Sequence, residues 1–333
     1  MADFYLDVVQ VGISCLLLVM IGYLMSYYKV FEGIEFKSMN QFTAKIGFPF
    51  LLFRSLASKK IREISFVPLV NALLMNSSAQ ITICLVFLFP FNDKLYTYLS
   101  TVVSSCYVNY VIIGIPIFSS IWGNTYNHVP AICSFCHYIL LVPLFIIWSQ
   151  LWRIKKEKLE SGETSTGITF MDVLMAFYSA LKTPLVIGNL IGLIWSAIGF
   201  DFPIFFQYIS QYLGDCVVVY ALVCIGRFLH EKSLVSCHWF HLLICLLIRF
   251  FVCPGFSLLW CKVLNVDNRT SRQCIVLSML PAANAGFILA SSVGIGANVA
   301  SAMVFWTLIF IVPVLMIWFY VFDHLSLFPD III

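Results

Sequence analysis

The stretch SSCYVNYVIIGIPIFSSIWG, residues 104–123, places a glycine and a proline inside an apolar run long enough to cross a membrane. A second stretch, SRQCIVLSMLPAANAGFILASSVGIG at residues 271–296, interrupts an apolar run in the same way. A break in a membrane helix frees backbone groups that lipid cannot satisfy, so it persists only where protein or a cavity surrounds it. Two such breaks at matching places in two halves of a chain are typical of a transporter's binding site.

The composition agrees with a membrane protein. Of the 333 residues 61% are hydrophobic and 11% are charged, with a mean hydropathy of +0.97, whereas soluble domains carry roughly 25% charged residues. The net charge of +3 comes from basic residues in short loops, which form no nucleic-acid patch. Nearly all of the twelve cysteines lie in apolar runs, where cysteine packs as a small hydrophobe, so we expect no metal and no cofactor.

The apolar segments predict an all-α polytopic protein with ten membrane helices, because one span needs about 20 apolar residues. The fourth and ninth are the interrupted ones. The longest loop, 152–169, divides the chain into a first repeat at 1–151 and a second at 170–333, and it is predicted to be cytoplasmic with the N-terminus outside. The ten predicted spans are 6–27, 39–57, 65–90, 97–120, 128–150, 171–199, 204–227, 236–260, 273–293 and 298–321.

Five spans per half is an odd number, so the two halves must face opposite ways in the membrane. That arrangement is an inverted repeat with a two-fold axis in the membrane plane. A weak internal resemblance agrees with it, since residues 109–123 align with residues 280–294.

In the first interruption, Asn109 supplies a polar amide, Gly114 permits close backbone approach, and Pro116 removes a helix donor. The half-helix that follows directs its partly positive N-terminus at the membrane midplane, which favours an anion. The alternative is an ordinary proline kink in a packed helix.

The second interruption carries Pro281, Asn284 and Gly286 in a window of small residues. Small residues also mark plain helix–helix contacts. Two asparagine-bearing breaks in corresponding spans nevertheless favour a substrate-binding site over two unrelated kinks.

Two ionisable residues are predicted at membrane depth. Arg249 lies within an apolar run, and Asp215 lies early in the seventh span. An embedded charge is costly and needs a partner, so each is a candidate either for a coupling charge or for a structural charge.

Several motifs together resemble the auxin efflux carrier (PIN-like) membrane transport family, which is related in fold to the bile acid sodium symporters. The spacing from Asn109 through Gly114 and Pro116 to Gly123 resembles the family's crossover signature. Four further stretches agree with it: IGFPFLLFRSLA at 46–57, LKTPLVIGNLIGLI at 181–194, LIRFFVCP at 247–254 and MLPAANAGFILA at 279–290.

The resemblance implies a scaffold domain, a transport domain and a homodimer. It also implies that broken helices 4 and 9 cross, with a substrate carboxylate held beside Asn109, Pro116, Pro281 and Asn284. The implied function is efflux of a small organic anion such as auxin or a carboxylate, by alternating access. In the third span, only Asn71 and Asn76 stand as polar substitutes where plant members carry an acid and a lysine, so the resemblance is weakest for proton coupling and auxin recognition.

The implied protein is a multi-pass carrier of the plasma membrane or endoplasmic reticulum, whose partners are its anion and the lipid bilayer. An intramembrane enzyme is disfavoured, because no H-E-x-x-H motif occurs and no nucleophile, base and orienting group can be assembled. A non-transporting sensor or receptor that kept the carrier fold is the main alternative, and a channel-like uniporter is another.

Overall fold

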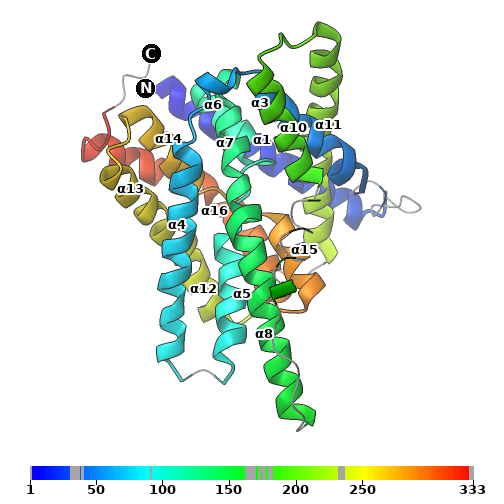
Figure 1. Cartoon of the computed structure of the whole chain (residues 1–333), viewed down its shortest axis with the longest axis vertical. Coiled ribbons are helices and arrows are strands. Elements are labelled where there is room, and N and C mark those ends of the chain that lie inside the picture. The colour runs from blue at the N-terminus through cyan, green and yellow to red at the C-terminus, as the bar shows by residue number, and fades with distance from the viewer. Residues whose placement is uncertain are drawn as a thin grey trace.

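The computed structural model describes the chain except for residues 1, 31–37, 39–40, 91, 162–169, 172–173, 175–177, 179–181, 183, 232–236 and 330–333. The described residues fold into helices and form no strand (Figure 1). These helices are α1 (Ala2–Tyr27), α3 (Phe48–Ala57), α4 (Val67–Ile83), α5 (Lys94–Cys106), α6 (Gly114–Trp122), α7 (His128–Cys133), α8 (Val142–Ser161), α10 (Pro184–Ile198), α11 (Ile204–Glu231), α12 (Trp239–Leu247), α13 (Cys253–Val263), α14 (Asn268–Ser278), α15 (Asn284–Val293) and α16 (Ala297–His324).

Within the described residues, five helical stretches are long and apolar enough to cross a membrane. This confirms the prediction of an all-helical membrane protein. The five stretches are Val67–Leu88, Asn124–Arg153, Ile204–Glu231, Trp239–Val263 and Ala297–His324. Parts of the spans predicted at 39–57, 171–199 and 236–260 lie outside the described residues, as does most of the second half of the predicted loop, since α8 continues to Ser161.

The helices pack in two groups. In the first group α1 lies along α11 and α3 lies along α10. The crossing of α1 and α11 is very close: a Cβ added at Gly22 would lie 2.2 Å from the carbonyl oxygen of Val223, and one added at Gly226 would lie 1.9 Å from that of Val19. Glycine on both helices is therefore required for this contact.

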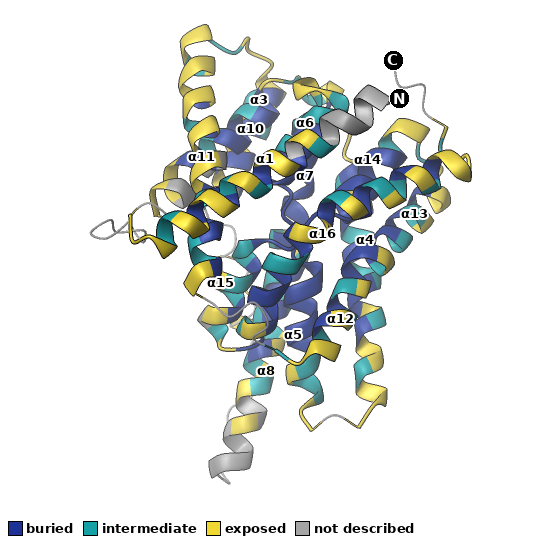
Figure 2. Ribbon diagram, turned by 180° about the vertical axis from the view of Figure 1, so that it is seen from behind, coloured by how far each residue is buried: buried dark blue, intermediate teal, exposed yellow. Residues whose placement is uncertain are grey.

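The second group contains α4, α5, α8 and α12 to α16. Here α13 packs against α4 and α14, and α5 packs against α15 and α16. Figure 2 shows that α7 and most of α5 are buried, whereas exposed residues cover much of α11. Large apolar side chains such as Ile204, Phe205 and Tyr212 are among those exposed on α11, as expected for a surface that faces lipid.

Two of the long stretches contain one π-helical turn each. The segment η5 (His137–Leu141) joins α7 to α8, and η6 (Ile248–Val252) joins α12 to α13. Such turns widen an α-helix locally and are frequent at functional sites. The first begins with His137 and the second carries Arg249, and both side chains reach the same interior region.

Candidate functional site

Four helix ends meet inside the second group, with α6 extending from it toward the first. Helix α5 ends at Cys106 and α6 begins at Gly114, while α14 ends at Ser278 and α15 begins at Asn284. The two non-helical connections between these ends lie side by side and form one antiparallel bridge, between Val108 and Ala282.

Two backbone hydrogen bonds flank this bridge. The N–H of Asn109 donates to the carbonyl of Pro281 at 2.8 Å, and the N–H of Ala283 donates to the carbonyl of Tyr107 at 2.9 Å. Val108 and Ala282 therefore form a non-hydrogen-bonded antiparallel pair, whose two residues do not bond to each other. Their own N–H groups point away from the bridge and need other partners, because they are buried.

Side chains from two further helical stretches supply those partners. Nε2 of His137 accepts from the N–H of Val108 at 3.1 Å, and Oγ1 of Thr307 accepts from the N–H of Ala282 at 2.9 Å. The imidazole also packs against the rings of Tyr107 and Tyr110, whose centroids lie 4.2 and 5.2 Å away. Sequence reasoning missed both anchors, since a lone polar residue in an apolar helix gives no sign of what it will bond.

The glycines of the two interruptions permit close approach of the two segments. A Cβ at Gly114 would lie 2.8 Å from a methyl group of Leu280, and one at Gly286 would lie 3.0 Å from Cβ of Tyr107. Each glycine therefore faces the other interrupted segment. Substitution at either position would push the segments apart.

The same capping chemistry occurs at both interrupted segments. Asp93 precedes α5 and accepts from the N–H of Tyr96, and Asp267 precedes α14 and accepts from the N–H of Thr270. At the far ends, Gly123 follows α6 with φ +81° and Gly294 follows α15 with φ +79°. A side chain would be strained at either glycine.

Of the predicted asparagines, Asn109 lies in the connection between α5 and α6, five residues before α6 begins, and Asn284 is the first residue of α15. Asn109 is 3% exposed, and its Oδ1 accepts from the N–H of Ile112 at 3.1 Å. Its Nδ2 has no hydrogen-bond partner within the described part of the chain, and neither has Oδ1 of Asn284. Buried polar atoms are normally satisfied, so these two amides leave hydrogen-bonding capacity unused. The peptide N–H of Gly114 is already bonded, to the carbonyl of Asn109.

Arg249 is fully buried. It donates to the carbonyls of Leu280 and Ser105 at 2.8 and 2.9 Å, and also to the carbonyl of Ser278. The predicted embedded charge thus contacts the C-terminal ends of α5 and α14 and the segment that follows α14.

A cavity of about 670 Å³ lies where α6 approaches α3 and α11. Its wall includes Ile115 and Pro116 from the first turn of α6, Arg54 from α3, and Asp215 from α11. Asp215 is exposed there, so the structure does not bury this carboxylate. The volume is within the range of small-molecule sites, roughly 300–1,000 Å³.

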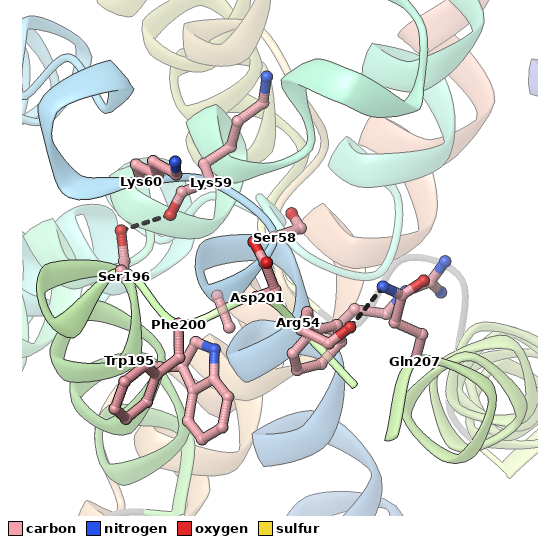
Figure 3. A pocket seen from close by; sticks show the side chains of 12 residues that line it. Arg54, Ser58, Lys59, Lys60, Trp195, Ser196, Phe200, Asp201 and Gln207 are labelled. Atoms are coloured by element: carbon pink, nitrogen blue, oxygen red, sulfur yellow. Dashed lines mark hydrogen bonds between the residues drawn. The ribbon is translucent and has the colours of Figure 1, made fainter. Parts of the chain in front are cut away.

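A second cavity of about 370 Å³ adjoins the first and shares Arg54, Ser58 and Lys59 with it. Figure 3 shows these residues together with Asp201 and the aromatic side chain of Trp195. Three basic side chains line this smaller cavity (Arg54, Lys59 and Lys60) against one acid, so its charge favours anions. Within the part of the chain that is described, no cluster of three or more metal-ligating side chains occurs.

The chain was compared with protein families and with curated proteins. A family model described as "Membrane transport protein" matches residues 7–319, nearly the whole chain. A search of curated proteins finds no match.

Proposed function

The chain is a member of the membrane transport protein family, the auxin efflux carrier (PIN-like) group, as its motifs indicated, and we propose that it carries a small organic anion across the membrane. In this proposal, residues 94–122 and 268–293 are two interrupted membrane helices that cross at the bridge. They belong to two inverted five-helix repeats. The protein acts by alternating access at this crossing rather than by catalysis.

The observation that carries the proposal is the unused amide of Asn109, in the connection between α5 and α6. Its Nδ2 is buried, has no partner within the described residues, and can donate to a carboxylate. The N-termini of α6 and α15 each add about half a positive charge. Together they match one negative charge, so we expect a monoanion to be favoured.

The 670 Å³ cavity supports an access route to this point. Its wall includes Pro116, in the first turn of α6, and Arg54, which attracts anions. It is lined by α3, α6, α11 and residues 124–127, so a movement of α6 relative to α3 and α11 would open or close it.

The test is uptake of a panel of labelled organic anions, including indole-3-acetate and dicarboxylates, into proteoliposomes. Asn109→Ala is compared with Asn71→Ala. Asn71 is equally buried but fully bonded: Nδ2 donates to the Ser257 carbonyl at 3.0 Å, and Oδ1 accepts from the Ser257 hydroxyl at 2.7 Å. We expect Asn109→Ala to lose saturable uptake by at least about tenfold, the equivalent of one charge-assisted hydrogen bond.

Asn71→Ala should instead lower the melting temperature more than Asn109→Ala, and it should retain uptake per folded molecule. Saturable uptake that survives Asn109→Ala unchanged would remove the crossing from the substrate site. Uptake of no anion by folded, correctly inserted wild-type protein would refute the organic-anion proposal, and ligand binding without flux would then indicate a sensor.

A further inference from the structure

Arg249 places a positive charge permanently inside the protein, next to the crossing. The side chain is 0% exposed and projects from the π-turn η6. Its three hydrogen bonds all go to backbone carbonyls, those of Ser105, Ser278 and Leu280. Ser105 lies in the last turn of α5, Ser278 is the last residue of α14, and Leu280 is the second residue after α14.

No described acidic side chain forms an ion pair with Arg249. A buried, unpaired charge is costly, so the counter-charge must come from another source. The C-terminal end of a helix carries about half a negative charge on its unpaired carbonyls. Two such ends, those of α5 and α14, supply about one negative charge, which matches the single positive charge of the guanidinium.

The C-terminal ends of interrupted helices are also the groups that coordinate coupling cations in secondary transporters. Here the guanidinium of Arg249 already donates hydrogen bonds to the carbonyls at these helix ends. A sodium ion at the same place would add a second positive charge beside Arg249 with no further counter-charge in a region of low dielectric constant.

We infer that Arg249 is a built-in counter-cation that replaces an alkali coupling ion at the crossing, so that transport by this chain is independent of sodium. The transport part of this inference rests on the proposed function. The binding part does not, because it concerns the carbonyl cluster alone.

The planar fork of arginine also has a mechanical consequence. Because it joins α5 and α14 to the stretch Trp239–Val263, the two half-helix ends cannot separate without losing a hydrogen bond inside the protein. The crossing and this stretch are therefore expected to move as one unit.

The test measures melting of the detergent-solubilised full chain in sodium chloride and in choline chloride at equal ionic strength. The variants are Arg249→Gln and Arg249→Lys, and the control is Arg272→Gln. Arg272 is also a buried arginine, 6% exposed, but it donates to the carbonyl of Phe328 and pairs with Asp323 at 3.6 Å, away from the bridge.

We expect wild-type protein to melt at the same temperature in both salts. Arg249→Gln should melt several degrees lower in choline chloride and regain part of the loss with sodium or with millimolar methylguanidinium. Arg249→Lys keeps the charge but lacks the fork, so it should melt at an intermediate temperature without a sodium effect. Arg272→Gln should lose the same number of degrees in both salts and gain nothing from methylguanidinium.

A sodium-specific rise in the wild-type melting temperature would overturn the inference, and this arm needs no variant to fold. An Arg249→Gln protein as stable as the wild type would overturn it as well. Wild-type uptake of any transported anion should be equal in sodium and choline media. If no anion is taken up, the proposed function is refuted. The melting comparison still tests the role of Arg249, because it does not depend on transport.

Discussion

The anchoring of the second crossing segment by Thr307 gives a prediction that can be worked out in energy. Thr307 is fully buried, and its hydroxyl has two bonds. It donates to the carbonyl of Met303 in its own helix at 2.5 Å and accepts from the N–H of Ala282 at 2.9 Å. Thr307→Val keeps the shape of the side chain and removes the acceptor, so the N–H of Ala282 loses its partner.

The expected cost follows from that orphaned donor. A buried polar group left unsatisfied costs about 1–3 kcal/mol, whereas hydrogen bonds between membrane helices average about 0.6 kcal/mol and reach about 1.7. The N–H of Ala282 belongs to a buried, non-helical segment and has no other acceptor nearby in the described part of the chain. We therefore expect a cost close to the maximum of about 1.7 kcal/mol for hydrogen bonds between membrane helices. A loss of about 1.5 kcal/mol lowers the melting temperature by about 2 °C in a chain of this size.

Thr82→Val is the matched control. The hydroxyl of Thr82 donates only to the carbonyl of Ser78 in its own helix, at 2.9 Å, so the same chemical change leaves no N–H without a partner. Unfolding can be followed with a thiol-reactive fluorogenic dye, because Cys106, Cys245 and Cys253 are fully buried in the native structure. Equal melting temperatures for Thr307→Val and Thr82→Val would refute the proposed anchoring.

Two further substitutions test the remaining contacts. His137→Phe keeps an aromatic ring but removes the acceptor for the N–H of Val108, so it should destabilise the protein by about 1–2 kcal/mol, and His137→Gln should recover part of that loss in the same dye assay. Gly226→Ala places a methyl group 1.9 Å from the carbonyl oxygen of Val19, so we expect it to lower the yield of folded protein severalfold. The control is Gly255→Ala, whose new Cβ has nothing within 4 Å and which should fold as wild type. Both yields can be measured by fluorescence-detected size-exclusion chromatography.

The sequence alone indicated the helical membrane class, the family and the two interruptions, because these depend on local composition. Prolines and glycines inside apolar runs are visible without knowing any contact. The structure brings Asn109 into a direct backbone hydrogen bond with Pro281. Which backbone atoms pair, and which side chains anchor them, depends on how helices distant in sequence pack together.

The internal alignment illustrates this limit. It pairs residues 109–123 with residues 280–294, and the two glycines at the helix ends, Gly123 and Gly294, obey it. The bridge does not, because it pairs Val108 with Ala282, which is three positions away from the residue that the alignment would choose. The connection from the bridge to the final glycine is longer in the first segment, and a single offset cannot describe both ends.

The partner of Arg249 could not have been found from the sequence for a different reason. A search for a buried acid opposite the arginine would fail, because the compensating charge belongs to the ends of α5 and α14 and exists only once those helices have formed and met. Arg249, His137 and Thr307 then tie the crossing to three neighbouring helical stretches, whereas glycines tie α1 to α11 in the other group. Since internal contacts stiffen both groups, we expect a carrier of this architecture to move at the cavity of about 670 Å³ that α6 lines together with α3 and α11.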